Sequence, residues 1–208
     1  MKRVPDLFPR VLDDPAWAGR YAESSARRNK AIAKRFVDML RETGFEKARV
    51  LDAGCGAGDV LIELARACPE AKMVGIDLSE PLLDMASVAM ESAGMAERVS
   101  FEKGDVQAMP FEDGSFDVVI SLNVLHYVDD PVAMLNEIER VLAPRGVLGL
   151  GALKRSWLAP LMPAMKMAYT AAEAREVLQR SKLRPWVLTE FRLAFSVGAG
   201  EAVVSQGG

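Results

Sequence analysis

A glycine-rich turn is the most informative stretch of the sequence. Residues 50–59 read VLDAGCGAGD, so that an apolar run passes directly into three glycines at alternate positions. Without side chains, Gly54 and Gly56 let the backbone approach a ligand closely. A dinucleotide-binding fingerprint, G-x-G-x-x-G, would need glycine where Asp59 stands. Because that carboxylate and the nearby Asp52 would repel a pyrophosphate, we expect a ligand without phosphates, and the acidic rim favours a cation.

Two further carboxylates follow apolar runs later in the chain. Asp77 ends the run KMVGID, and an acidic residue at the end of the second strand of a Rossmann-like sheet is well placed to accept hydrogen bonds from ribose hydroxyls. Leu78 can then pack on an adenine face. Asp105 can accept a hydrogen bond from an exocyclic amine, while the backbone of Val106 addresses a ring nitrogen. Because the carboxyl ends of parallel strands share one edge of a sheet, Asp52, Asp77 and Asp105 predict one nucleoside site.

Short apolar runs alternate with helical stretches through the middle of the chain. We expect strands over residues 48–53, 72–77, 99–104, 116–121 and 146–152, and helices over residues 57–67, 81–93 and 131–142. Ser79 and Asp130 stand just before helix-starting prolines and are typical N-caps. Strands rich in Val, Ile and Leu that alternate with helices predict a parallel sheet with helices on both faces.

The two flanks add elements to this α/β core. Apolar residues at helical spacing predict an amphipathic helix from Asp14 to Arg41. The sequence TAAE at 170–173 is a capping box that opens a helix to about Ser181. We expect a last pair of strands over residues 186–191 and 201–206, joined by a turn near Gly198 and Gly200.

Composition limits the class of protein. Of the 208 residues, 50% are hydrophobic and 26% charged, which excludes global disorder and allows a substantial core. No apolar run approaches the ~20 residues that span a bilayer, and the N-terminus lacks the apolar stretch of a signal peptide, so we expect a cytoplasmic protein. With two cysteines and one histidine, we expect no disulfide framework, no Cys/His zinc site and no bound metal.

Charge is unevenly distributed. Residues 51–150 carry 6 basic and 18 acidic side chains, a net charge of −12, whereas residues 1–50 and 151–208 carry +5 and +4. The whole chain, at −3, has no dominant positive field, which argues against nucleic acid or an anionic membrane as a partner. The acidic middle suits a cationic ligand.

Taken together, these motifs resemble the class I, Rossmann-like S-adenosylmethionine-dependent methyltransferases, and most of all their small-molecule branch, which includes quinone-biosynthesis and natural-product enzymes. The resemblance covers residues 48–152 through the stretches VLDAGCGAGDV, GIDLS, GDVQAMPF, FDVVISLNVLHYVDDP and RVLAPRGVLGL. It implies a doubly wound α/β fold with a seven-stranded, mostly parallel sheet whose last strand is antiparallel. It also implies an N-terminal helical lid over residues 1–46 and a methyltransferase core over residues 47–208.

The resemblance also assigns a cofactor site. It places the methionine part of S-adenosylmethionine over the glycine turn with Asp52 near its ammonium group, the ribose on Asp77, and the adenine on Asp105. Ser121 to Asn123 would face the sulfonium. The residues matched to the cofactor are Asp52, Gly54, Cys55, Gly56, Asp77, Leu78, Asp105, Val106, Ser121, Leu122 and Asn123. We interpret the Cys55 thiol as packing rather than as a nucleophile.

The reaction implied is displacement at the methyl carbon by a nucleophile of a small organic acceptor, with S-adenosylhomocysteine as product. The protein then mainly aligns the reactants and excludes water. For a nucleophile that carries a proton, His126 in the loop after the fourth strand is the candidate general base; the alternative is a structural role in a turn. Tyr21, one helical turn after Trp17, could cover the methyl group or contact the acceptor, or the pair could staple the helix to the core.

Residues 153–169 match the variable cap that this family places over its acceptor. The methionines and Trp157 could form an adaptable apolar wall, although core packing explains the methionines as well. Lys154, Arg155 and Lys166 could meet an anionic group on the acceptor.

Two other functions use the same motifs. One is a non-catalytic partner or regulatory subunit that binds S-adenosylmethionine without methylating anything. The other is aminopropyl transfer from the decarboxylated cofactor, against which Asp52 argues because it would face the intact amino acid moiety. The acceptor, the atom methylated and the choice between monomer and homodimer stay open at this level.

Overall fold

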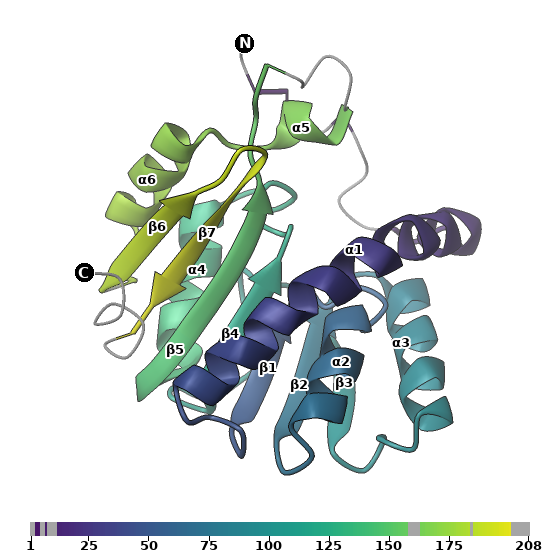
Figure 1. Ribbon diagram of the computed structural model, residues 1–208. Coiled ribbons are helices and arrows are strands. Elements are labelled where there is room, and N and C mark those ends of the chain that lie inside the picture. The colour runs from purple at the N-terminus through teal and green to yellow at the C-terminus, as the bar shows by residue number, and fades with distance from the viewer. Residues whose placement is uncertain (1–2, 5–6, 8–11, 158–162, 184, 201–208) are drawn as a thin grey trace.

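The computed structural model describes residues 3–4, 7, 12–157, 163–183 and 185–200. Over this part of the chain, seven strands form one sheet in the order β3-β2-β1-β4-β5-β7-β6 (Figure 1). The strands are β1 (Arg49–Ala53), β2 (Lys72–Asp77), β3 (Val99–Lys103), β4 (Phe116–Leu122), β5 (Leu142–Leu153), β6 (Trp186–Glu190) and β7 (Ala194–Ala199). Strands β1 to β5 pair in parallel, and β7 runs antiparallel to both β5 and β6. The predicted sheet is confirmed.

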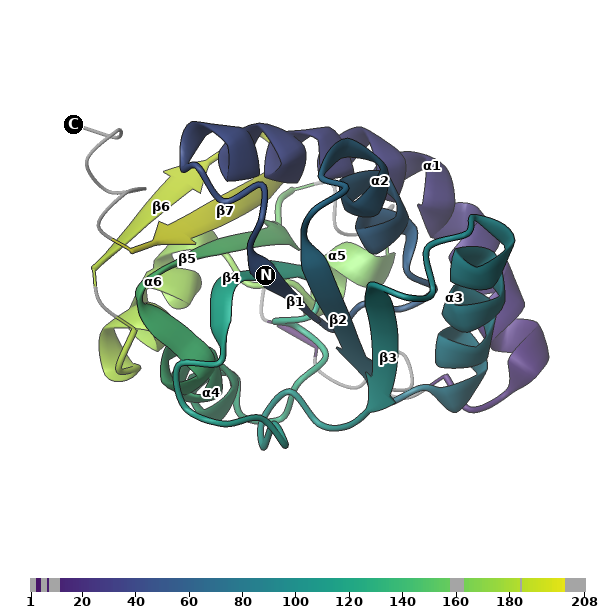
Figure 2. The same cartoon turned by 90° about the horizontal axis from the view of Figure 1, so that it is seen from below.

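Helices cover both faces of this sheet (Figure 2). They are α1 (Pro15–Glu42), α2 (Asp59–Ala67), α3 (Glu80–Ser92), α4 (Pro131–Val141), α5 (Pro163–Met167) and α6 (Ala171–Arg180). Alternate strand residues point to opposite faces, so Val50 packs with α1, α2 and α3, whereas Leu51 packs with α4 and α6. None of the helices in the described ranges combines the length and apolar character needed to cross a membrane.

The helix starts follow the capping signals in the sequence. The Asp14 side chain accepts a hydrogen bond from the Trp17 amide at 2.8 Å, and Asp130 accepts from the amides of Val132 and Ala133. The capping box at the start of α6 is present in both directions. These side chains fix where α1, α4 and α6 begin, and therefore which loops open toward the ends of the strands.

The end of the chain differs from the expectation. The strand after β6 is β7, whereas the predicted strand at 201–206 lies outside the described residues. Gly198 lies inside β7, opposite Gly149 of β5 and Val187 of β6, so the predicted turn at this glycine is wrong. The physical reason is the alternation of Phe195 and Val197, which are buried, with Ser196 and Gly198, a pattern that forms a half-buried strand.

Candidate functional site

A cavity of about 630 Å³ opens where the order of the sheet reverses between β1 and β4. In open α/β sheets, ligands bind at such a switch point, outside the carboxyl ends of the strands. Of the site candidates from the sequence, those that line the cavity are Trp17, Tyr21, Gly54, Asp77, Leu78, Asp105, Val106, Leu122, Asn123 and His126. Asp52, Cys55, Gly56 and Ser121 lie in the same loops and strand ends but do not belong to the lining.

The glycines of the turn serve different purposes. All three have positive φ, which favours glycine. A Cβ on Gly54 would stand 2.2 Å from a methyl of Val124, so this glycine makes room for a side chain rather than for a ligand. A Cβ on Gly58 would press on Ala86 at 3.0 Å. At Gly56 a Cβ would meet none of the described atoms within 4 Å, so open space for a ligand lies beside this residue.

Backbone amides orient the carboxylate of Asp77. The amide of Gly56 donates to its Oδ2 at 2.9 Å, and the amide of Ser79 donates to its Oδ1 at 2.9 Å. Burial raises the pKa of Asp77, while these amide hydrogen bonds act in the opposite direction. Each oxygen keeps lone pairs for the cavity, so the side chain is a preoriented acceptor for hydroxyl groups.

Asp52 lies beneath this acceptor and is 2% exposed. Its burial, and secondly the negative charge of Asp77, raise the pKa of Asp52 to about 8. Two acids that share a buried position favour a cationic group nearby, because such a group lowers the cost of ionising both. Asp59, by contrast, accepts a hydrogen bond from Asn29 of α1 at 3.1 Å and does not line the cavity.

Asp105 is held by a residue that the sequence analysis missed. Gln107 donates its backbone amide to Asp105 at 2.8 Å and its side-chain nitrogen to both carboxylate oxygens at 3.1 Å. The Gln107 side-chain oxygen accepts from the amide of Asp130 at 2.6 Å and so ties this loop to the start of α4. The only signal in the sequence is the short spacing between Asp105 and Gln107.

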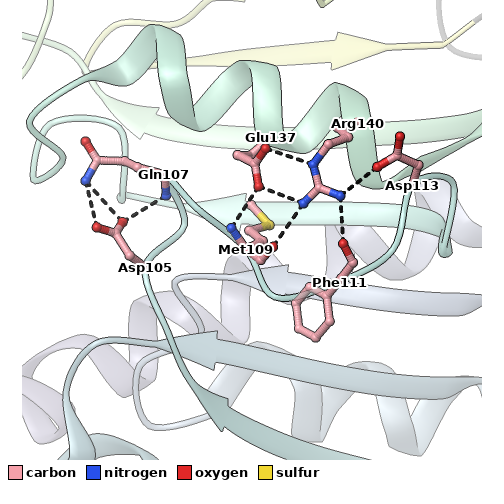
Figure 3. A network of polar contacts seen from close by, with 7 residues as sticks. All are labelled: Asp105, Gln107, Met109, Phe111, Asp113, Glu137 and Arg140. Carbon is pink, nitrogen blue, oxygen red and sulfur yellow. Dashed lines mark hydrogen bonds and ion pairs between the residues drawn. The ribbon is translucent and has the colours of Figure 1, made fainter.

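An ion-pair network fixes the rest of the loop between β3 and β4 (Figure 3). Arg140 of α4 donates to the carbonyls of Met109 at 2.9 Å and Phe111 at 2.7 Å, and pairs with Glu137 at 2.7 Å and Asp113 at 2.8 Å. Glu137 in turn accepts from the Met109 amide at 2.8 Å. The adenine-side carboxylate predicted from the sequence therefore sits on a braced loop.

Helix α1 forms another wall of the cavity. Its residues on this side recur about once per helical turn. They are Trp17, the adjacent pair Arg20 and Tyr21, Ser24 and Arg28. Burial raises the pKa of Tyr21 to about 12, so its phenol stays neutral. Trp17 is 52% exposed, with the Arg20 guanidinium 5.1 Å from its ring. Trp17 therefore does not staple the helix to the core; Phe36 and Leu40 of the same helix do that.

His126, in the loop after β4, lines the cavity. The residue is 3% exposed, and its Nδ1 is buried with no hydrogen-bond partner among the described residues. Burial, and secondly the charge of Arg3, lower the pKa of His126 to about 4, so the imidazole is neutral. Its ring lies 4.4 Å from that of Tyr127, which the sequence analysis also missed and which lines the same cavity.

A family model described as a methyltransferase domain matches residues 45–187, which is more than half of the chain. The chain belongs to the methyltransferase family. Over 149 residues the chain is 39% identical to 27-O-demethylrifamycin SV methyltransferase of Amycolatopsis mediterranei, covering 70% of this chain and 54% of the relative. Over 156 residues it is 32% identical to demethylmenaquinone methyltransferase of Lactobacillus johnsonii, covering 72% and 60%.

Solved structures agree with this methyltransferase fold. The crystal structure of an S-adenosylmethionine-dependent methyltransferase from Aquifex aeolicus superposes with a TM-score of 0.75 at 24% identity, covering 89% of this chain and 97% of that one. The resemblance found in the motifs is therefore confirmed. The chain spans between a third and three fifths of the length of the first curated relatives that it matches.

The end of β4 shapes the methyltransferase site through backbone geometry. The Ser121 hydroxyl is buried and donates to the Ala53 carbonyl at 2.8 Å, which joins β4 to β1 rather than facing the cavity. Asn123 has a φ of 60°, and its side-chain oxygen accepts from the Leu153 amide at 3.0 Å. Cys55 packs against Gly75, where a Cβ would lie 2.7 Å from its sulfur, and burial raises the pKa of its thiol.

The cap of the methyltransferase differs from the expectation in two respects. Lys154 pairs with Glu190 at 2.7 Å, and Arg155 is buried, paired with Glu173, so neither cation is free for an acceptor. The methionines of α5, Met165 and Met167, are at most 1% exposed and belong to the packed interior rather than to the cavity wall. Met162 of the predicted wall lies outside the described residues.

Proposed function

We propose that the protein transfers a methyl group from S-adenosylmethionine to a small organic acceptor. The observation that carries this proposal is a single cavity with two chemically different ends. Asp77 and Asp105 follow β2 and β3 and line one end, above the buried Asp52, whereas His126 and Tyr127 follow β4 and line the other; Tyr21 of α1 lies between them, within electrostatic reach of both Asp77 and Tyr127. The acidic end and the open space at Gly56 fit a cationic nucleoside without phosphates. When bound, the cofactor supplies an activated methyl group on a sulfonium.

The residues of the acidic end bind and orient. The two amide hydrogen bonds on Asp77 leave its remaining lone pairs for the two ribose hydroxyls. Asp105, braced by Gln107, accepts from the adenine amino group. Asp52 stabilises the ammonium group. Binding energy at these fixed positions is converted into alignment of the reacting atoms, which can supply ~7–11 kcal/mol of the barrier reduction.

The residues of the other end surround the acceptor. Residues 1–46 act as a lid, because α1 contributes Tyr21 to the cavity, and residues 153–169 act as a cap. The neutral phenols of Tyr21 and Tyr127 exclude water while offering hydrogen bonds. The neutral imidazole of His126, which lines the cavity, is the candidate to take the proton of an acceptor hydroxyl or acidic carbon.

Several observations favour this function over its alternatives. The curated relatives at 39% and 32% identity are named as methyltransferases, and neither is named as an aminopropyl transferase or a regulatory subunit. The cavity is far smaller than a groove for nucleic acid, which favours a small acceptor. We place the activity in the cytoplasm, where the two free cysteines, Cys55 and Cys68, would stay reduced.

The test combines binding with turnover. We expect S-adenosylhomocysteine to bind in calorimetric titration, and we expect a metabolite extract incubated with the protein and methyl-labelled S-adenosylmethionine to yield a labelled product. Gly56→Val should abolish the binding because it fills the open space. Gly94→Val is the matched control: Gly94 also has positive φ and no described atom within 4 Å of a Cβ, but it lies between α3 and β3, at the opposite end of the strands from the glycine turn.

The outcomes separate the alternatives. Binding without any labelled product would favour a non-catalytic partner, and preference for the decarboxylated cofactor would favour aminopropyl transfer. If Gly56→Val binds S-adenosylhomocysteine as well as Gly94→Val does, the glycine turn is not part of the cofactor site.

A further inference from the structure

Arg3 connects two segments that are far apart in the sequence and meet beside the cavity. Its Nε donates to the carbonyl of Met167, the last residue of α5, at 2.7 Å. Its Nη2 donates to the carbonyl of His126, in the loop after β4, at 3.1 Å. The guanidinium also lies 4.2 Å from the centroid of the Tyr169 ring. One planar side chain thus contacts both the loop that carries His126 and the cap.

The cap side of this contact is firmly attached to the core. Arg155 at the end of β5 donates its side chain to the carbonyl of Ala168 at 2.8 Å and its amide to the carbonyl of Tyr169 at 2.9 Å. Next to Arg3, the amide of Val4 donates to the carbonyl of Lys166 at 2.9 Å. Arg3 therefore links the His126 loop to this anchored part of the cap.

The contacts of Arg3 described above do not neutralise its positive charge. They are made with two carbonyls and an aromatic ring, none of which carries a full negative charge. Among the described residues, Tyr127 on the same loop is in ring contact with the imidazole, and Tyr169 lies beneath Arg3; Arg28 acts on Tyr127, and Glu173 and Asp130 act on Tyr169. The positive charge therefore acts on His126, together with burial, to favour the neutral imidazole.

We propose that Arg3 is a positioning residue for the acceptor end of the cavity: it fixes the His126 loop against the cap, so that a neutral imidazole is held in the cavity wall. This inference rests on the proposed function, because it assigns His126 to the acceptor. Arg3 acts through the His126 loop and does not itself contact the cofactor or the acceptor. Its fork geometry matters, because the two carbonyls are reached by two different nitrogens of one guanidinium.

The chain offers a direct measurement because it contains one histidine. In a chain without an affinity tag, the pKa of His126 can be followed by NMR titration, and the exchange of the Tyr127 amide, which donates to Val124, reports on the loop. We expect Arg3→Gln to raise the pKa of His126, because one of its two lowering causes is removed, and to speed exchange at Tyr127. Arg3→Lys should keep part of the pKa effect, because the charge remains, but not the protection from exchange.

Lys166→Gln is the matched control, since it removes one positive charge from the same cap without touching the guanidinium. It should leave both readouts unchanged. The proposal is overturned if Arg3→Gln leaves the His126 pKa and the Tyr127 exchange at their wild-type values, or if it only lowers global stability in urea. The dissociation constant of S-adenosylhomocysteine in Arg3→Gln should stay within about twofold of the wild-type value, because the cofactor site is at the other end of the cavity. Failure of the wild-type chain to bind it would reject the proposed function while leaving the Arg3 measurement interpretable.

Discussion

Each aspartate of the site is held by a different kind of neighbour, and this decides what it can still bind. Backbone amides fix Asp77, a glutamine side chain fixes Asp105, and Asp52 is controlled chiefly by burial. One amide belongs to Gly56 in the glycine turn and the other to Ser79 at the start of α3, so Asp77 is a rigid acceptor. A rigid acceptor loses little entropy when a ligand binds, and its hydrogen bonds contribute more fully to affinity.

We therefore expect Asp77→Ala to weaken binding of S-adenosylhomocysteine by about tenfold or more, because two hydrogen bonds to a charged group are lost. Calorimetric titration measures this dissociation constant directly. Asp84→Ala, on the exposed side of α3, serves as the control and should bind as the wild type does. An unchanged dissociation constant in Asp77→Ala would remove this residue from the site.

At the other end of the cavity, His126→Ala should lower turnover by about a hundredfold if the imidazole accepts a proton in the reaction. The affinity for S-adenosylhomocysteine should change little, because His126 lies away from the acidic end. Comparison of kcat with the dissociation constant separates these effects. A loss of activity that merely parallels a loss of stability in urea would assign His126 to a structural turn.

The three aspartates could be predicted from the sequence because each lies near the end of a predicted strand or just after it, and strand ends meet at one edge of a parallel sheet. Gln107 and Val124 could not, since both lie in loops whose paths depend on contacts with distant residues. The role of Gly54 was predicted only in part: the spacing indicates a turn, but not that Val124 occupies the space above it.

Among the elements, α1 has two functions along its length. Its C-terminal half packs Phe36 and Leu40 on the sheet, whereas its N-terminal half faces the cavity. Asn29, between the two halves, joins α1 to α2 through its hydrogen bond to Asp59, the first residue of α2. Arg28, next to Asn29 in the helix, lines the cavity, and its positive charge acts on the phenols of Tyr21 and Tyr127.

This placement suits the carboxylate of an amino acid tail whose ammonium group is near Asp52. Arg28→Gln should weaken the binding of S-adenosylhomocysteine about tenfold, because a charge-assisted hydrogen bond is lost. Binding of 5′-methylthioadenosine, which lacks the amino acid part, should not change. Arg20→Gln, on the same side of α1, is the control. Equal losses for both ligands would show that Arg28 supports the fold of the cavity rather than a carboxylate.

Element order was largely predictable, and the wrong turn at Gly198 has a physical cause. The local pattern around residues 194–199 does not show by itself that these residues form a strand. Their pairing with β5 and β6 places them in the sheet. Such a placement depends on the whole sheet.

On the scale of the whole molecule, the site holds buried carboxyl groups whose ionisation costs free energy. Asp52 lies buried with Asp77 nearby, and both have raised pKa values, chiefly because of burial. A fold that keeps such acids is less stable without a ligand than one with neutral side chains in their places. Ligand binding and global stability are therefore coupled through the same carboxylate.

The coupling predicts the pH dependence of stability. Folded Asp52 keeps its proton up to about pH 8, whereas its ordinary pKa is 3.8. Between these values the folded chain binds more protons than the unfolded chain, so the free energy of unfolding falls as pH rises, by at most about 1.4 kcal/mol per pH unit for this group. Asp77 acts in the same direction. Asp52→Asn cannot ionise and should therefore flatten the decline, becoming more stable than the wild type toward the alkaline end.

Urea unfolding of the ligand-free chain at several pH values between about 5 and 8 measures this slope. Asp84→Asn, which removes an exposed carboxylate, should follow the wild-type curve. If Asp52→Asn follows it too, Asp52 ionises in the folded chain as easily as in the unfolded chain. Addition of S-adenosylhomocysteine should stabilise the wild type more at neutral pH than at pH about 5, because its ammonium group favours the ionised carboxylate.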